Sequence, residues 1–266
     1  MTLQEFQRAL GALIASPELC RSFISNPEPI FDYYDLSPRE QQRLKSVVLQ
    51  QGMSTNCSLY RTNRITPIYT LLPKTCFMLG AELVPQIERF WECNQDTDMQ
   101  FGREMHRFAG FIIEQIKLGR IENRGLEEII NFELAVNDLR FLPRHQIVHE
   151  LQSVRQKHEP TRPRLNPLMR VVVFRHEPVT LLRQLTALRP PPYDLIEGEF
   201  HLLLDSSGDD LDVKQIDSRL GNLLQSIESE ILPSLSDEDL KTLMDAGLVV
   251  YEDQKVFGLT APYLFS

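Results

Sequence analysis

The chain has 266 residues and a net charge of −9, with 42% apolar and 24% charged residues. This composition is typical of a globular protein and excludes a disordered or collagen-like chain. No apolar run approaches the roughly 20 residues that a membrane-spanning helix needs, and residues 1–10 lack the basic start and apolar core of a signal peptide. We therefore expect a cytoplasmic protein.

The excess of acidic residues lies in the second half. Residues 1–167 contain 20 basic residues (Lys and Arg) and 20 acidic residues (Asp and Glu), whereas residues 168–266 contain 8 basic and 17 acidic residues. A nonspecific phosphate-binding surface requires a basic field, so the second half is a poor candidate for binding nucleic acid. The irregularly spaced cysteines contain no CxxC pair and are expected to be mostly buried, reduced thiols, although a disulfide stays open: Cys20, Cys57, Cys76 and Cys93.

Helical start signals dominate the first half. Ser16 precedes Pro17, and Ser37 precedes Pro38 with Glu40 at the third helical position, which is a capping box. Apolar residues recur at three- and four-residue steps after these signals. This spacing predicts helices over 3–14, 17–24, 27–34, 38–51, 81–92, 105–116 and 126–139.

Residues 58–80 have a polar head and an apolar body. Tyr60, Arg61 and Asn63 open a helix that Pro73 should end, and Gly80 closes a compact turn over 76–79. These polar residues are a possible anion site, but an Arg and an Asn at the head of a helix more often hydrogen-bond neighbouring loops. Glu133 lies among apolar residues, so we expect it to be partly buried and to face Arg61 as its cation.

The second half alternates strands and helices. Residues 143–167 are rich in proline and predict a linker. Strands are expected over 169–175 and 200–204, helices over 178–188, 216–231 and 236–247, and a wing-like hairpin over 248–258. The predicted fold is α+β: a mainly helical domain over 1–142, the linker, and a small α/β domain over 168–266 with a winged-helix-like C-terminal hairpin.

Residues able to do chemistry are sparse. There is no Gly-rich phosphate loop, no HExxH and no GxSxG. His145 and His149 stand four apart, but a surface pair is a simpler interpretation than a metal site. His106 follows Glu104 and shares a helix face with Glu114, yet a buried or partly solvated histidine is the simpler interpretation. His176 and His201 have no partner of identifiable role. Glu127 and Glu128 are read as first-turn charges that suit the helix dipole. We therefore expect no catalytic residue, no metal and no cofactor, with an enzyme resting on the histidines as the least favoured reading.

Several segments together resemble a known domain: YRTN at 60–63, LLPKTCFMLG at 71–80, Phe90-Trp91, FAGFI at 108–112 and FELA at 132–135. They are similar to a helical domain, once labelled as DNA-binding, in partner proteins of multinuclear non-heme iron oxidative enzymes such as the methanobactin-pathway partner. Residues 16–40 also resemble the small helical subunit of extradiol ring-cleavage dioxygenases, which covers the active site of a catalytic partner.

The first resemblance implies a non-catalytic subunit that pairs with an iron enzyme and presents a ribosomally made precursor peptide to it. Peptide capture would use strand addition at a sheet edge, and the acidic second half suits a basic leader. The candidate edge-strand residues are Met169, Val171, Val173, Phe200, Leu202 and Leu204; the structural motif is Tyr60, Arg61, Asn63, Pro73, Gly80 and Glu133. The alternatives are a DNA-binding regulator and an accessory subunit of a ring-cleavage dioxygenase.

Overall fold

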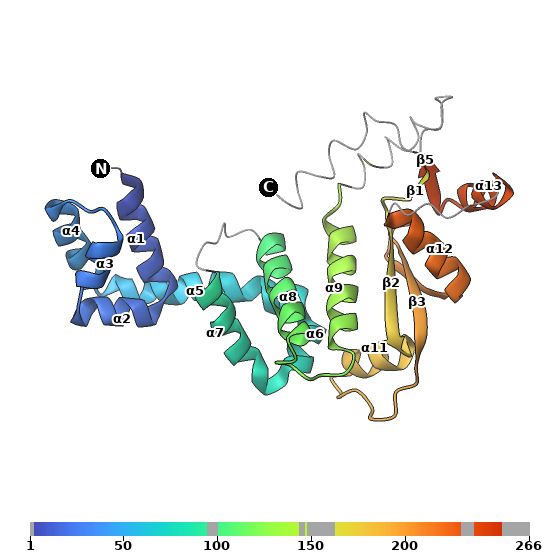
Figure 1. Cartoon of the computed structure of the whole chain (residues 1–266), viewed down its shortest axis with the longest axis horizontal. Helices are drawn as coiled ribbons and strands as arrows, with labels where there is room; N and C mark the ends of the chain where they lie inside the picture. The colour runs from blue at the N-terminus through green and yellow to red at the C-terminus, as the bar shows by residue number, and fades with distance from the viewer. Residues whose placement is uncertain (1–2, 95–100, 144–146, 148–162, 230–236, 252–266) are drawn as a thin grey trace. The chain divides into compact units, whose positions relative to one another are not determined.

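The protein folds into helices and two small antiparallel sheets (Figure 1), so the predicted α+β class is confirmed. This computed structural model describes residues 3–94, 101–143, 147, 163–229 and 237–251. The chain divides into two compact units, Met1–Glu114 and Gln115–Ser266.

The first unit begins with α1 (Leu3–Ala15), α2 (Pro17–Ser25), α3 (Glu28–Tyr33) and α4 (Pro38–Val48). The predicted caps are confirmed. The Ser16 hydroxyl accepts from the Leu19 amide at 3.1 Å, and Ser37 and Glu40 form the reciprocal capping box. The apolar faces of these helices bury Leu13, Phe23 and Leu44 in one core.

The next helices are α5 (Gly52–Leu71), α6 (Pro73–Leu79), α7 (Leu83–Cys93) and α8 (Phe101–Lys117), with a 3₁₀ turn over Gly80–Glu82. Pro73 ends α5 and Gly80, at φ 51°, ends α6 as predicted. Two details differ. Residues 76–79 belong to α6 and form no separate turn. α5 begins earlier than predicted, at Gly52, because Met53 and Cys57 extend its buried face and pack in the same core as α1.

The second unit is built on a three-stranded sheet in the order β2-β3-β4. Its elements are α9 (Leu126–Phe141), β1 (Pro163–Leu165), β2 (Met169–His176), α11 (Pro178–Thr186), β3 (Glu197–Asp205), β4 (Asp212–Ile216), α12 (Ser218–Glu228), α13 (Asp237–Asp245) and β5 (Val249–Tyr251). β1 pairs with β5, so the first strand of the expected hairpin has a partner in the predicted linker, while residues 255–258 lie outside the described part of the chain.

Both faces of this sheet are covered. Phe174 of β2 meets Phe132 of α9 with ring centres 6.1 Å apart, and the opposite face packs Val171 and Leu203 against Leu224 of α12. The sequence places the helix at 126–139 in the helical domain over 1–142, whereas in the structure α9 belongs to the second unit and packs against β2. A helix that is apolar on several sides must be buried, but the pattern does not say against which element.

Candidate functional site

The predicted peptide-binding strands occupy different places in the sheet. β3 is central and pairs with β2 on one side and β4 on the other. The prediction that Phe200, Leu202 and Leu204 lie at a sheet edge is therefore wrong. The sequence showed an apolar strand but not β4, whose residues are exposed except for half-buried Ile216 and so show no alternation of burial.

β2 is an edge strand among the described residues, since it pairs only with β3. The side chains of Met169 and Val171 are buried in the core beneath α12, and Val173 is half-buried. These side chains therefore hold the sheet against its helix. The groups of β2 that could pair with a further strand are therefore its main-chain amides and carbonyls.

A buried polar pair joins α9 to the end of β2. The Glu128 carboxylate lies 2.8 Å from His176 Nδ1 and accepts the His176 amide at 3.3 Å. The interpretation of Glu128 as a first-turn charge is incomplete, because its side chain is buried and paired. Sequence reasoning missed the pair because 48 residues separate its members. His201 differs: it is fully buried on β3, its ring nitrogens have no hydrogen-bond partner in the described structure, and the Glu199 carboxylate lies 3.9 Å away.

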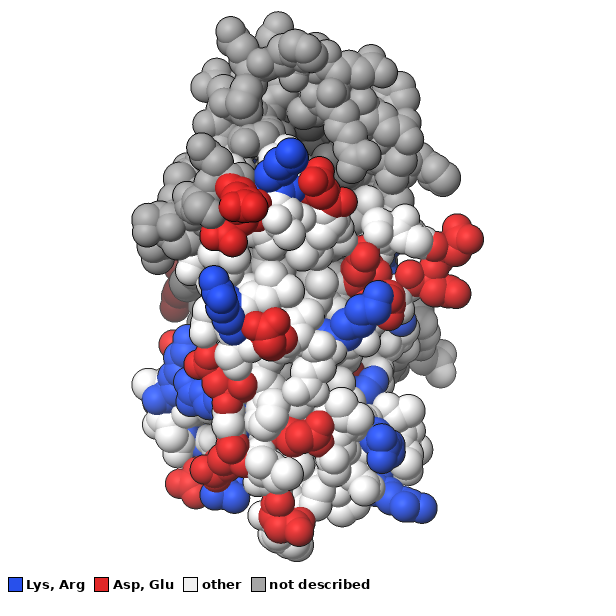
Figure 2. All heavy atoms as spheres, turned by 90° about the vertical axis from the view of Figure 1, so that its right-hand side faces the viewer, with Lys and Arg blue, Asp and Glu red and all other residues white. Residues whose placement is uncertain are grey.

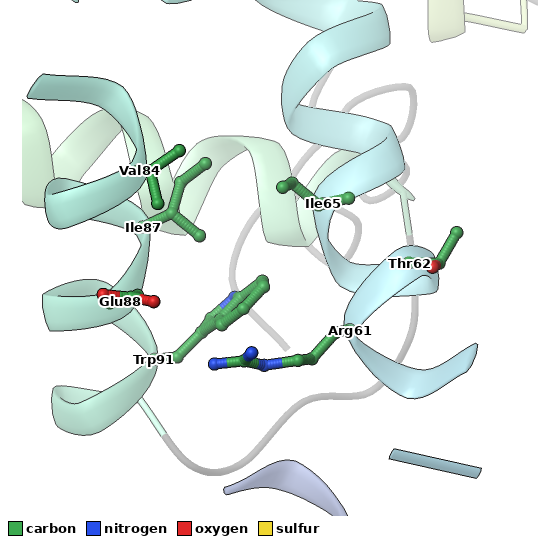
Figure 3. Close-up of a pocket in the computed structure, with 7 residues that line it drawn as sticks. All are labelled: Arg61, Thr62, Ile65, Val84, Ile87, Glu88 and Trp91. Carbon is green, nitrogen blue, oxygen red and sulfur yellow. The ribbon is translucent and has the colours of Figure 1, made fainter. Parts of the chain in front are cut away.

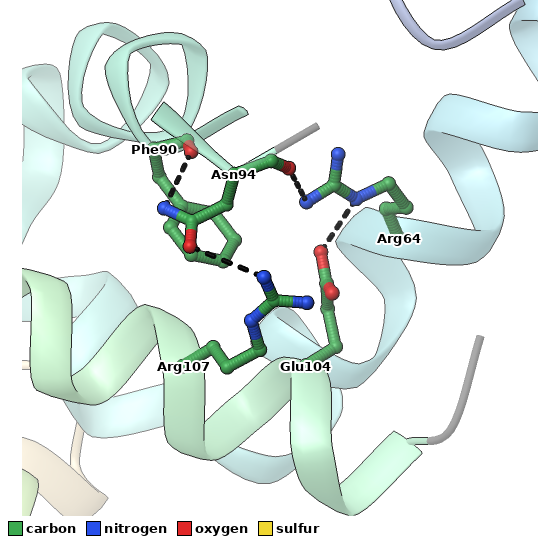
Figure 4. Close-up of polar contacts among 5 residues, drawn as sticks. All are labelled: Arg64, Phe90, Asn94, Glu104 and Arg107. Atoms are coloured by element: carbon green, nitrogen blue, oxygen red, sulfur yellow. Dashed lines mark hydrogen bonds and ion pairs between the residues drawn. The ribbon is translucent and has the colours of Figure 1, made fainter. Parts of the chain in front are cut away.

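The buried cation of the first unit is Arg64, which is 2% exposed. Its Nε donates to Glu104 Oε1 at 2.6 Å and its Nη2 donates to the Asn94 carbonyl at 3.0 Å (Figure 4). Arg107 Nη2 donates to the Asn94 side chain at 3.3 Å. This cluster ties α5, α7 and α8 together. A signal for it is present in the sequence, because Arg64 continues the buried stripe of Cys57 and Ile68 at helical spacing.

A pocket of about 250 Å³ opens between α5 and α7 (Figure 3). Its floor is aliphatic and aromatic, and Arg61 and Glu88 are its charged residues. The Arg61 guanidinium carbon lies 5.3 Å from the centre of the Trp91 ring, within range of a cation–π contact. The lining residues are Arg61, Thr62, Ile65, Val84, Ile87, Glu88 and Trp91.

The other predicted motif residues are spread along these helices. Tyr60 is half-buried near Arg64, Asn63 is exposed, and Pro73 and Gly80 bound α6. Glu133 is buried, as expected. It belongs to the second unit and Arg61 to the first, so the proposed pairing of the two stays a prediction.

Metal-binding and thiol candidates are few. Among the described residues no three His, Cys, Asp or Glu side chains group as a metal site would need. His145 and His149 lie outside the described residues. The cysteines are free thiols, and burial raises the pKa of both Cys20 and Cys57, whereas Cys93 is exposed.

No protein-family model matches the chain, and no curated protein matches it either. Within the described residues, every helix is too short or too polar to cross a lipid bilayer. The structure is that of an α+β protein. Its first unit has a pocket between two helices, and its second unit has a small sheet covered by helices.

Proposed function

We propose that the protein is a non-catalytic partner subunit that binds a ribosomally made precursor peptide and presents it to a multinuclear non-heme iron oxidative enzyme. The edge of β2 carries this proposal. Helices cover both faces of the sheet, so in the described structure its edges are what a further strand can reach. An extended peptide added there gains main-chain hydrogen bonds without any catalytic group.

β2 is a better acceptor than β4, the other edge strand. β4 carries Asp212 and Lys214, both exposed, and charged side chains on an edge oppose pairing with another chain. β2 also carries cations, half-buried Arg170 and exposed Arg175, but between them it contains Val171-Val172-Val173, which favours extended backbone. The acidic excess of residues 168–266 adds attraction for a basic leader.

The same charge argues against a DNA-binding regulator. Figure 2 shows Lys and Arg mixed with Asp and Glu over the face it presents, without a continuous basic field. In α12, Arg219 is the one cation able to read a base edge. We expect no retardation of duplex DNA in a gel-shift titration at low salt, and a specific shifted band would favour the regulator.

The direct test uses the full chain together with a multinuclear non-heme iron enzyme and a precursor peptide chosen from the genes that neighbour its own. We expect the three to co-purify and the peptide to slow amide hydrogen exchange in β2, with β4 as the internal control. Protection confined to β4 would place the peptide-binding site at β4 instead of β2. The absence of affinity for both enzyme and peptide would refute the proposal.

A further inference from the structure

The pocket between α5 and α7 holds a guanidinium, that of Arg61, which has no ion-pair partner among the described residues. The Arg61 Nε has no hydrogen-bond partner there either. Arg64, one turn further along α5, lies 5.5 Å from the centre of the same Trp91 ring, but its charge is balanced by Glu104. Two arginines therefore share one aromatic neighbour, and of the two only Arg64 has a carboxylate partner within the described residues.

We propose that this pocket binds the C-terminal carboxylate of a partner chain that ends in an aliphatic residue. Arg61 holds the carboxylate, since a guanidinium fixed on an aromatic face binds carboxylates in a defined geometry. Ile65, Val84 and Ile87 receive the last side chain. Figure 3 shows these aliphatic side chains grouped at one end of the pocket and the guanidinium at the other.

The size of the pocket favours a chain end. Sites for drug-sized molecules enclose roughly 300–1,000 Å³, whereas about 250 Å³ leaves room for little more than one residue. A C-terminal residue carries its carboxylate and its side chain on the same Cα, so both fit together. An internal acidic side chain beside an aliphatic one would need room for two.

Glu88 restricts which chain end fits. Its carboxylate lines the pocket on α7 and repels a second negative charge, so a terminal Asp or Glu is disfavoured. It also accepts hydrogen bonds, which suits the amide N–H of the last residue. The recognised group is thus one carboxylate with one aliphatic side chain.

Trp91 is the only tryptophan of the chain, so its fluorescence reports on this pocket. The probes are N-acetyl-Ala-Leu-Leu with a free C-terminus, the same peptide as its C-terminal amide, and N-acetyl-Ala-Asp-Leu amide. We expect the free acid to change the Trp91 emission in a saturable titration. Both amides should bind at least about tenfold more weakly, because they lack the terminal carboxylate.

Three variants locate the effect. Arg61→Gln removes the charge, and Val84→Asp places an acid on the aliphatic side at a position that is 54% exposed. Each should weaken binding of the free acid by about tenfold or more while keeping the wild-type thermal midpoint. Arg89→Gln, on an exposed position of α7 outside the pocket, is the control and should bind like wild type.

Equal affinity for the acid and its amide, or an unchanged Trp91 emission up to millimolar peptide, would overturn the proposal. So would an Arg61→Gln variant that loses stability but keeps its affinity, which would return Arg61 to the structural role expected from the sequence. The proposal stands apart from strand addition at β2, since Trp91 emission reports the pocket and amide exchange reports the edge.

Discussion

Replacing Gly221 by Ala should destabilise the second unit. Gly221 lies in α12 against the central strand β3, where His201 is fully buried. A Cβ on Gly221 would meet His201 Cγ at 2.2 Å, Cδ2 at 2.3 Å and Cβ at 2.6 Å. The His201 Cβ and Cγ are the root of the side chain, so a rotamer change cannot clear the overlap and the helix must move away from the sheet.

The size of the effect follows from two opposing terms. Alanine favours a helix over glycine by up to about 1 kcal/mol. Overpacking a core costs about 1–3 kcal/mol, and the depth of this overlap places the substitution at or above the upper end. We expect a net loss of about 2 kcal/mol, which lowers the thermal midpoint of a unit of this size by roughly 4–8 °C.

Urea unfolding followed by circular dichroism measures the loss, and hydrogen exchange of the β3 amides locates it. The control is Gly110→Ala in α8, where an added Cβ meets nothing within 4 Å, so that variant should gain about 0.5–1 kcal/mol. His201→Ala removes the obstructing ring. The Cβ that remains at position 201 still overlaps the added methyl, so in that background Gly221→Ala should cost clearly less than in the wild type without becoming free. An equal cost in both backgrounds, or none in either, would refute the steric argument.

Three further outcomes are expected. Ser37→Ala should cost about 1 kcal/mol of unfolding free energy, measured in urea at neutral pH, which is the usual value of an N-cap hydroxyl. Hydrogen bonds from Ser37 lower the pKa of Glu40, so the difference in unfolding free energy between variant and wild type should shrink as the pH falls through that pKa. A pH-independent difference would contradict this. Arg64→Ala should cost about 3–5 kcal/mol, since it leaves the buried Glu104 carboxylate without its guanidinium, and a thermal midpoint equal to wild type would be inconsistent with the pair. Iodoacetamide should modify one thiol in the native protein, Cys93, as read by mass spectrometry, with the buried thiols reacting only in urea.

The sequence was most informative where the determinants are local. Ser16, Ser37, Pro73 and Gly80 begin or end helices where predicted, because capping and φ restrictions act within one turn of the chain. β4 escaped notice because its pairing with β3 is its main support, and exposed strands carry no apolar alternation.

The candidate sites depended on contacts between distant segments. The stretch around Arg61 was singled out, and it does line the pocket, but the buried ion pair belongs to Arg64 and Glu104, which are 40 residues apart. Glu88 drew no attention because an exposed glutamate in a helix is ordinary until a neighbouring helix is placed beside it.

The packing of α9 on β2 also decides where the chain can be divided. A fragment over 168–266, the domain predicted from the sequence, would lack α9. This helix covers Val172 and Phe174, which are 5% and 0% exposed in the whole protein. It would also leave His176 without Glu128. Such a fragment should aggregate on expression, whereas one that starts at Gly119, between α8 and α9, retains its own cover.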